Sequence, residues 1–242
     1  MTTELIDVSG FAHRAFHSLD PVLNRNGTNI APLKALAEIT KQKPDAVYVL
    51  EGENSRGYRQ KILPSYKSNR KNEPEKRAVL EKVKPLLIKT GVKIMQAPMG
   101  FEADDLIADM VKEPGEFIIV SQDKDFLQVL SDNPSDKKVQ IWDPVKKIFK
   151  NALFCMSRFG VKPSEFIFYQ ALVGDQADCI PGVKGIGPVA ATKIIKECKG
   201  DPETLDENWE WFAEKFPKLK SDDAVVHFVA SSHCVRLGVR SK

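Results

Sequence analysis

The stretch Gly100-Phe101-Glu102-Ala103-Asp104-Asp105-Leu106-Ile107-Ala108-Asp109-Met110 places acidic residues where the first turns of a helix are expected. Glu102 and Asp105 are three residues apart and share one helical face, and Asp104 lies one step round from Asp105. Acidic residues also favour a helix N-terminus for ordinary reasons of capping and of the helix dipole. The stretch alone therefore fits either a capped helix or a cation site, and the rest of the chain decides between them.

Composition indicates a globular protein of the cytoplasm. The 242 residues, 42% of them hydrophobic, suffice for one sizeable core or two small ones. The N-terminus lacks the basic and apolar regions of an export signal, and no apolar run approaches a membrane span, so we expect no membrane contact. The four cysteines lie far apart with no CxxC pair, which favours a reducing compartment over a zinc site or a disulfide framework.

Acidic and basic residues are segregated along the chain, and the formal net charge of +3 conceals this. Between Arg56 and Lys89 there are eleven Lys and Arg residues against three Glu, a local excess of +8. Such a block is typical of a solvated face or of a surface that meets an anionic partner.

Four short apolar runs predict buried β-strands, and three of them lead into carboxylates. Asp7 ends the first strand, Glu51 follows the second, and Asp123 and Asp125 follow the fourth. Ligands of open α/β sheets bind at the carboxyl ends of the strands, so we expect these acids at one functional edge. Asp7 also fits a capping role, while Ser9 disfavours a phosphatase nucleophile of the Asp-x-Asp type. The runs are residues 5–8, 46–50, 92–95 and 117–120, with an edge strand over 138–142 that turns into a hairpin at 148–149.

A strongly basic segment runs from Arg59 to Lys71, and Pro64 interrupts it. If the part after the proline is helical, Lys67, Arg70 and Lys71 share one face. Further helices are expected after the first strand, where Arg14 lies, over residues 33–42, and from Pro74 toward Gly91.

From residue 151 onward the strand-like runs disappear and short helices are expected. Asp175 and Asp178 are predicted to close one helix, and a glycine-rich turn over 182–187 opens the next. A turn of this kind presents backbone N–H groups to phosphate, whereas a dinucleotide site is excluded because no strand precedes the glycines. We expect the aromatic residues of the last third to pack in the core: Trp209, Trp211 and Phe212.

The acids at strand ends and helix starts form a set of nine that repel one another unless cations neutralise them. Hard oxygen ligands of this kind suit Mg²⁺ or Mn²⁺. Without this set the chain carries 24 acids against 36 basic residues, so a cluster of acids is expected within a protein that is otherwise basic. This is the electrostatic pattern of a nuclease, in which two metal ions about 4 Å apart act on a phosphodiester that basic residues hold. The set is Asp7, Glu51, Glu102, Asp104, Asp105, Asp123, Asp125, Asp175 and Asp178.

Five motifs then occur in consistent order through nearly the whole chain. They are Leu-Ile-Asp ending at Asp7, Pro-Ser-Tyr-Lys-Ser-Asn-Arg at 64–70, Glu-Ala-Asp-Asp at 102–105, Asp-Lys-Asp at 123–125, and the Gly-Asp-Gln-Ala-Asp-Cys-Ile-Pro-Gly-Val-Lys-Gly-Ile-Gly run at 174–187. With these motifs the sequence resembles the 5′-nuclease family, that is, the flap endonucleases and 5′-to-3′ exonucleases of phages, bacterial DNA polymerase I and eukaryotes. One motif would be a weak signal, and five in register are a strong one.

The resemblance implies an α/β fold with a PIN-like, mostly parallel central sheet flanked by helices. It implies a single 5′-nuclease domain over residues 1–242. In it, 1–150 form the catalytic core with a basic helical arch at about 62–90, and 151–242 form a helix-hairpin-helix-like region that grips duplex DNA. No polymerase domain follows, so we expect a stand-alone, monomeric nuclease in the cytoplasm of a bacterium or of a phage-infected cell.

The resemblance also implies the ligands and roles of the site. Two Mg²⁺ ions, for which Mn²⁺ can substitute, would be held by the nine acids. Asp7, Glu102 and Asp104 would serve mainly the first, while Asp123, Asp125, Asp175 and Asp178 would serve mainly the second. Asp105 would bridge or support them. Lys67 and Arg70 would contact the scissile phosphate at the base of the arch, and K⁺ would bind at the turn over 182–187. The expected DNA contacts are Arg14, Arg59, Lys61, Tyr66, Lys71, Gly182, Lys184, Gly185 and Gly187. For Tyr66 the alternatives are stacking on a base and simple packing within the protein.

Two positions depart from the family pattern, and two other functions stay open. Glu51 stands where many members have Asp, so its longer side chain either reaches the metal or lies out of register, and Cys179 replaces a residue that is commonly polar. The expected activity is hydrolysis of DNA phosphodiester bonds at 5′ ends and flaps, leaving a 5′-phosphate and a 3′-hydroxyl, in replication or repair. The alternatives are a catalytically impaired DNA-structure-binding protein and a PIN-type ribonuclease. The glycine-rich turn and the basic arch disfavour the ribonuclease.

Overall fold

The computed structural model describes residues 2–11, 37, 45–70 and 73–238, without the side chains of 73–79, 202, 203 and 206. The predicted helix over 33–42, apart from residue 37, and the positions of Arg14 and Lys71 lie outside the described residues. Residues 8–11 begin a helix directly after the first strand, as expected.

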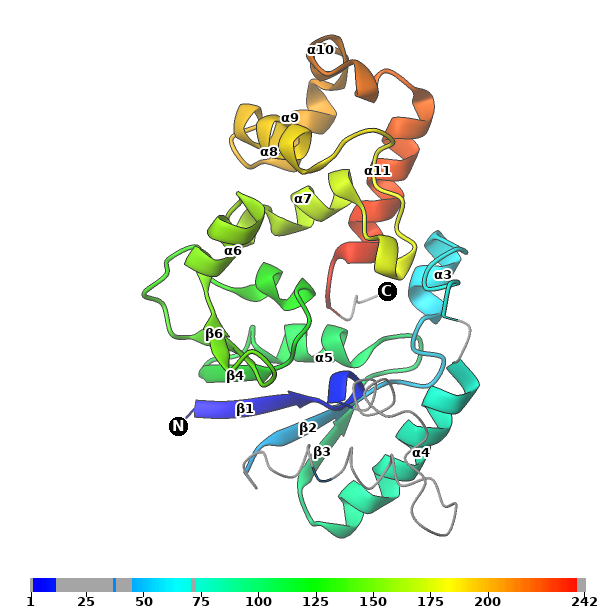
Figure 1. Cartoon of the computed structure of the whole chain (residues 1–242), viewed down its shortest axis with the longest axis vertical. Helices are drawn as coiled ribbons and strands as arrows, with labels where there is room; N and C mark the ends of the chain where they lie inside the picture. The colour runs from blue at the N-terminus through cyan, green and yellow to red at the C-terminus, as the bar shows by residue number, and fades with distance from the viewer. Residues whose placement is uncertain (1, 12–36, 38–44, 71–72, 239–242) are drawn as a thin grey trace.

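One six-stranded sheet forms the base of the molecule, in the order β3-β2-β1-β4-β5-β6 (Figure 1). The first five strands pair in parallel, and only the β5–β6 hairpin is antiparallel. All the predicted strands are confirmed, including this hairpin. The strands are β1 (Thr2–Asp7), β2 (Val47–Leu50), β3 (Lys93–Gln96), β4 (Glu116–Val120), β5 (Val139–Asp143) and β6 (Ile148–Lys150).

Alternate residues of the central strands pack into two different cores, because successive side chains point to opposite faces of a sheet. In β1, Leu5 joins the larger core and Ile6 joins the smaller one. The larger core includes Ile107 of α5 (Ala103–Met110), and the smaller includes Val83 and Leu87 of α4 (Glu73–Lys89). The sheet is therefore covered on both faces, as an α/β fold requires.

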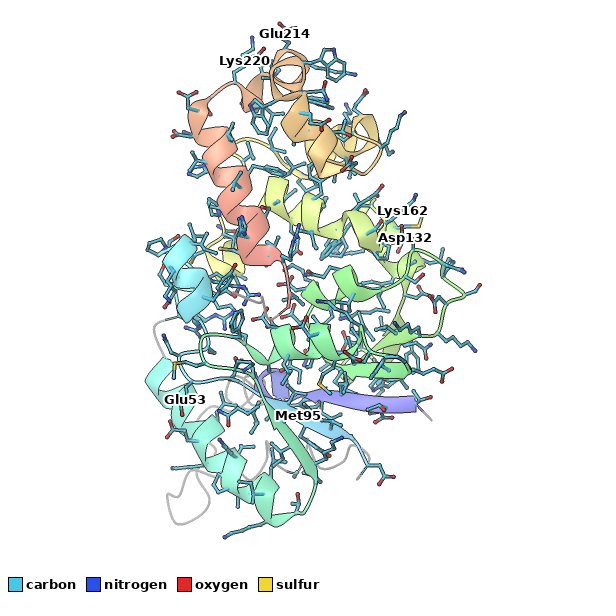
Figure 2. All side chains as sticks on the ribbon, turned by 180° about the vertical axis from the view of Figure 1, so that it is seen from behind. Glu53, Met95, Asp132, Lys162, Glu214 and Lys220 are labelled. Atoms are coloured by element: carbon cyan, nitrogen blue, oxygen red, sulfur yellow. The ribbon has the colours of Figure 1, made fainter. Side chains whose placement is uncertain are left out.

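The C-terminal helices stack on the α5 side of the sheet (Figures 1 and 2). The larger core continues into them without a break, since it contains both Leu5 and Phe228. At the junction, Asp132 accepts hydrogen bonds from the backbone N–H and the hydroxyl of Ser164 at 2.9 and 2.7 Å, close to Lys162 (Figure 2). The remaining helices and 3₁₀ turns are α3 (Gly57–Ile62), η1 (Asp125–Val129), α6 (Ala152–Phe159), η2 (Pro163–Glu165), α7 (Phe166–Val173), η3 (Gln176–Asp178), α8 (Pro188–Glu197), α9 (Pro202–Glu207), α10 (Trp209–Lys215), η4 (Pro217–Leu219) and α11 (Asp222–Val235).

Three local expectations need correction. Trp211 is 50% exposed, so of the three aromatic residues expected in the core only Trp209 and Phe212 pack there. Asp175 and Asp178 do not close α7, which ends at Val173 with Gly174 at its C-cap, and Asp178 ends only the short 3₁₀ turn η3. Asp175 instead caps η3 by accepting a hydrogen bond from the N–H of Ala177 at 2.9 Å.

The register of the sheet brings the predicted acids together. Ile6 pairs with both Tyr48 and Val120, so the carboxyl ends of β1, β2 and β4 lie side by side. No described helix is both long and apolar enough to cross a bilayer. The functional edge is therefore where the parallel strands end, beside the N-terminus of α5.

Candidate metal centre

A cleft of about 1100 Å³ opens at this edge, and acidic and basic side chains line it together. The segment predicted as an arch supplies one wall through Leu80, Glu81 and Lys84 of α4, whose Val83 and Leu87 are buried against the sheet. The charged residues of the lining that lie near the strand ends are Asp7, Glu51, Lys67, Arg70, Glu102, Asp104, Asp123 and Lys124.

Asp7 and Glu51 are held in place by donors from neighbouring segments. Asp7 accepts hydrogen bonds from Ser121 Oγ at 2.9 Å and from the Gly10 N–H at 3.1 Å. Glu51 accepts them from Ser9 Oγ at 2.7 Å and from the Ala103 N–H, in the first turn of α5, at 3.2 Å. Burial, and to a smaller extent the charge of Glu102, raises the pKa of Glu51 to about 7, and burial also raises the pKa of Asp7.

Glu102, the N-cap of α5, is ionised by its basic neighbours. Its Oε1 lies 2.5 Å from Lys67 Nζ, and its Oε2 accepts a 2.5 Å hydrogen bond from the Tyr66 hydroxyl. Burial alone would raise the pKa of Glu102, but Lys67 and Arg59 outweigh it and lower this pKa to about 2. Tyr66 is only 2% exposed, so the structure does not support its predicted stacking on a base and favours the packing alternative.

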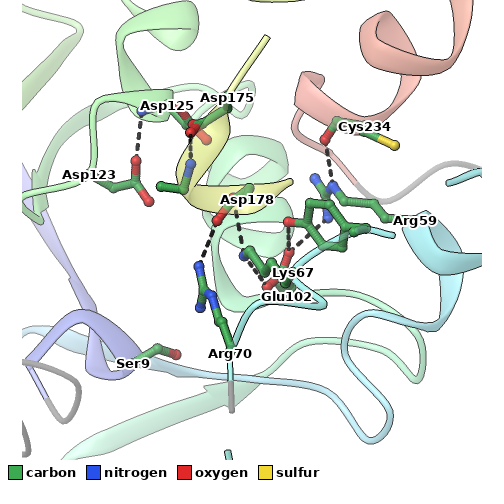
Figure 3. Close-up of polar contacts among 12 residues, drawn as sticks. Ser9, Arg59, Lys67, Arg70, Glu102, Asp123, Asp125, Asp175, Asp178 and Cys234 are labelled. Atoms are coloured by element: carbon green, nitrogen blue, oxygen red, sulfur yellow. Dashed lines mark hydrogen bonds and ion pairs between the residues drawn. The ribbon is translucent and has the colours of Figure 1, made fainter. Parts of the chain in front are cut away.

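Asp105 points away from the cleft into a buried ion pair. Both of its carboxylate oxygens accept hydrogen bonds from the Arg59 guanidinium, each at 2.7 Å, and Asp105 is 1% exposed (Figure 3 shows Arg59). Arg59, 2% exposed, also donates to the backbone oxygens of Cys234 and Arg236. The predicted DNA contact of Arg59 and the catalytic and ligand roles of Asp105 are therefore not supported, because each neutralises the other beneath the site.

Asp104 lies beside the cleft with an unsatisfied oxygen. Its Oδ1 is buried and has no hydrogen-bond partner among the described residues. Burial, together with the charges of Asp105 and Glu102, raises its pKa well above the usual value. A buried acceptor without a donor is costly, so this oxygen fits the ligand of a cation.

A second group of carboxylates comes from two segments, the start of η1 and the η3 turn (Figure 3). Asp125, Asp175 and Asp178 each offer an oxygen, and these atoms lie within 4.8 Å of one another, a spacing that fits a divalent cation. Lys124 Nζ lies 3.0 Å from Asp125 Oδ1 and also hydrogen-bonds Asp175 Oδ2. Asp123 Oδ1 accepts the N–H of Asp125 at 2.9 Å, which fixes this turn.

The pKa values of this second group are shifted in opposite directions. Burial, and then the charge of Asp123, raises the pKa of Asp125 to about 7 despite Lys124. Burial would also raise the pKa of Asp175, but the Lys124 ammonium outweighs it and lowers that pKa. Neighbouring carboxylates with divergent pKa values are typical of functional sites.

The segment from Pro64 to Arg70 consists of turns instead of the helix that was considered, and it contacts η3 directly. The Lys67 N–H donates to the Asp178 backbone oxygen at 2.8 Å, and Arg70 contacts Asp178 Oδ1 at 2.6 Å. Lys67 Nζ lies 3.5 Å from Asp178 Oδ2. The two basic residues that were predicted to act on phosphate thus lie between the two groups of acids.

The glycine-rich turn divides into a buried and an exposed part. Gly182 is buried, with a φ of +61° and its N–H donated to Ser231 Oγ at 3.1 Å. Its predicted contact with DNA is therefore not supported, because its donor is already used inside the protein. Lys184 and Gly185 are exposed, and Gly187 caps α8.

Four polar residues of the site were given no role in it from the sequence: Ser9, Ser121, Lys124 and Gln170. Ser121 directly follows a predicted strand and Lys124 stands between two acids, so both carried a local signal. Gln170 carried none, since it reaches Asp125 Oδ1 at 2.7 Å from α7, 45 residues further along the chain.

Known relatives share this architecture. A family model described as the N-terminal resolvase-like domain of 5'-3' exonucleases matches residues 2–160, and one described as their C-terminal SAM fold matches residues 161–225. The 5'-3' exonuclease of Aquifex aeolicus is 33% identical over 92% of this chain and 78% of its own length. Flap endonuclease Xni of Shewanella denitrificans is 32% identical over 76% of this chain and 73% of its own length.

Two further comparisons extend the match to a longer protein and to a solved structure. The thermostable DNA polymerase I of Thermus aquaticus is 32% identical over 84% of this chain, which matches only 25% of that polymerase. T5 5'-exonuclease, solved with bound zinc ions, superposes with a TM-score of 0.65 at 22% identity, over 97% of this chain and 86% of its own. The two family models together cover residues 2–225, and with them the sheet, the carboxylate edge and the helices up to the first turn of α11. The chain belongs to the 5'-3' exonuclease family.

Proposed function

We propose that the protein is a structure-selective 5′ nuclease that hydrolyses DNA phosphodiester bonds, as a 5′-to-3′ exonuclease and a flap endonuclease. Each cut would leave a 3′-hydroxyl on the released 5′ fragment and a 5′-phosphate on the remaining strand. The protein would act as a monomer in the cytoplasm, in replication or repair, with two Mg²⁺ ions that Mn²⁺ can replace. The observation that carries the proposal is that one group of carboxylates lines the cleft and a second lies next to it, in contact with Lys67, Arg70 and Lys124 of the lining.

The ligand sets follow from which acids lie together. Asp7, Glu102 and Asp104 would hold one cation, with Glu51 either as a further ligand or as the acceptor that fixes the first turn of α5 through the Ala103 N–H. Asp123, Asp125, Asp175 and Asp178 would hold the other. The unpartnered Asp104 oxygen and the spacing of the second group support this assignment. Divalent cations at such a pair of sites lower the pKa of water and neutralise charge on the attacking and leaving oxygens.

Lys67 and Arg70 would hold the scissile phosphate and stabilise the charge that it gains. Burial would lower the pKa of Lys67, but Glu102 and Asp178 outweigh it, so this pKa lies above the ordinary value and the ammonium stays charged. A permanently charged lysine cannot accept a proton at neutral pH, which assigns it an electrostatic role. The Arg70 guanidinium, with a raised pKa as well, offers a planar fork of donors that matches phosphate oxygens.

Duplex binding would use the exposed part of the glycine-rich turn. Lys184 supplies a charge, and Gly185 and Gly187 allow close approach of the phosphate backbone to the N-terminus of α8. A K⁺ ion at this turn would bridge the protein and a phosphate. Lys61, exposed in the last turn of α3, and the predicted residues Arg14 and Lys71 would add contacts that carry no sequence information.

The test is cleavage of a 5′-end-labelled flap duplex with Mg²⁺ or with EDTA, next to an RNA strand of the same sequence. The proposal predicts metal-dependent release of short 5′ fragments cut near the junction, and little cleavage of the RNA. Binding of the flap without cleavage in Mg²⁺ or Mn²⁺ would favour the DNA-structure-binding alternative. Preferential cleavage of the RNA would favour the ribonuclease.

A further inference from the structure

Lys124 places a positive charge inside the second group of carboxylates. Its ammonium contacts Asp125 Oδ1 at 3.0 Å and hydrogen-bonds Asp175 Oδ2. The oxygens of Asp125, Asp175 and Asp178 that lie within 4.8 Å of one another are the atoms that a cation at this place would need. The ammonium and a divalent cation therefore require the same oxygens.

The second group is neutralised by the protein itself, whereas Asp104 is not. Besides Lys124, Arg70 and Lys67 lie 2.6 and 3.5 Å from the Asp178 carboxylate, so each of the three acids has a basic partner. On the other side of the cleft, Asp104 Oδ1 has no partner among the described residues. In the first group Lys67 pairs with Glu102, but Lys67 is only 8% exposed, whereas Lys124 is 41% exposed. The two halves of the site thus differ in how freely a counter-ion can leave.

The Lys124 side chain has room to leave. It is 41% exposed and lines the cleft, while the acids that it contacts are 13% and 9% exposed. A divalent cation bound by carboxylate oxygens at about 2.1 Å would repel an ammonium that lies on the same oxygens. Binding of the cation must therefore move the ammonium toward solvent.

We propose that Lys124 is an internal counter-ion that competes with the divalent cation for Asp125 and Asp175, and so sets the metal concentration at which the second site fills. The inference rests on the proposed function, because it takes this group of carboxylates as a metal site. It adds that the Lys124 ammonium occupies the carboxylate oxygens of Asp125 and Asp175 when metal is scarce.

The experiment titrates Mn²⁺ alone, without DNA, into metal-free protein by calorimetry. Lys124→Met keeps the length of the side chain and removes its charge. Lys215→Met is the matched control. Lys215 lies in α10, away from the sheet, is 42% exposed, and pairs with Glu197 of α8 at 2.8 Å (Figure 1 labels α10). Asp175→Asn identifies which binding step belongs to the second site.

We expect Lys124→Met to bind Mn²⁺ about tenfold more tightly at the Asp175-dependent site, a change of about 1.4 kcal/mol. Lys215→Met should bind as the wild type does. An unchanged or weaker affinity of Lys124→Met at that site would overturn the inference and leave the proposed metal site standing. If Asp175→Asn removes no binding step from any of the proteins, the proposed metal site falls, and the inference falls with it.

Thermal unfolding separates competition from a purely structural role. Without metal, Lys124→Met should melt below the wild type, since its carboxylates lack their counter-ion. Saturating Mn²⁺ should close this gap, because a ligand that binds only the folded state stabilises it more the more tightly it binds. A gap of the same size with and without Mn²⁺ would show that Lys124 serves the fold alone, and would overturn the inference.

Discussion

Lys67 keeps its charge in a buried position because two carboxylates face it. Its Nζ lies 2.5 Å from Glu102 and 3.5 Å from Asp178, next to the cleft. We predict that Lys67→Ala lowers the single-turnover rate of flap cleavage about 100-fold, by the loss of one charge that stabilises the transition state. Its affinity for the flap should change no more than about threefold, the size of the small loss expected for one phosphate contact. A loss confined to affinity, like that expected for the exposed control Lys61→Ala, would remove the catalytic role.

Arg59 is a structural residue, although its charge suggested a contact with DNA. It is 2% exposed, and Arg59→Met would leave the Asp105 carboxylate buried without its cation. Breaking a buried ion pair by removing one partner costs about 3–5 kcal/mol, whereas replacing both partners by apolar residues is often nearly neutral. In urea unfolding we therefore expect a large loss for Arg59→Met, partial recovery for Arg59→Met with Asp105→Leu, and almost no change for the exposed Lys61→Met. Equal stabilities of the three variants would refute the structural role.

At the scale of elements, two glycines of the turn before α8 are required for different reasons. A Cβ at Gly182 would lie 2.3 Å from the Gly174 nitrogen, at a φ of +61°, so Gly182→Ala must displace backbone. Nothing lies within 4 Å of a Cβ at Gly187. We predict that Gly182→Ala lowers the free energy of unfolding by more than about 2 kcal/mol, as expected for strain in a packed turn. Gly187→Ala should keep the stability within about 0.5 kcal/mol of the wild type, and should weaken duplex binding. A lower melting temperature for Gly187→Ala than for Gly182→Ala would contradict these two roles.

Over the whole molecule, the buried carboxylates with raised pKa values destabilise the fold at high pH when no metal is present. Burial raises the pKa of Glu51 from 4.5 to about 7, so the fold favours its protonated form. That contribution to stability is fully present below about pH 4.5 and is lost as the pH rises through 7, by roughly 3 kcal/mol. In thermal unfolding without metal, the melting temperature of Glu51→Gln should therefore lie above that of the wild type at pH 8 and equal it near pH 5. The exposed control Glu53→Gln should follow the wild type at both. If the melting temperature of Glu51→Gln depends on pH as that of the wild type does, Glu51 is not the group that causes the loss of stability at high pH.

The sequence predicted what depends on local pattern. Apolar runs such as Phe117–Val120 identified the strands, and acids placed after them, such as Asp7 and Asp123, identified the edge where the cleft lies. These predictions succeeded because buried parallel strands need continuous apolar residues, and because parallel strands end together.

The errors concern residues whose surroundings come from distant parts of the chain. Charge alone could not show that Arg59 is bound by Asp105 and by the backbone oxygen of Cys234, 175 residues away. Tyr66 was assigned to DNA for its ring, but Glu102 takes its hydroxyl. Trp211 was assigned to the core by its size, yet half of its surface stays exposed. For Arg59 and Tyr66 a contact made on folding decided the role, and no local pattern records it.

The central claim is that the carboxylates at the sheet edge form a catalytic metal centre. The most direct measurement is the single-turnover rate of flap cleavage in Mn²⁺ for the wild type, Asp175→Asn and the exposed control Asp136→Asn, with DNA affinity measured in parallel. The claim predicts that Asp175→Asn cleaves at least about 1000-fold more slowly than the wild type, as expected when a metal centre is lost. Its affinity for the flap should not change, and Asp136→Asn should cleave at the wild-type rate. Cleavage by Asp175→Asn at the wild-type rate would contradict it.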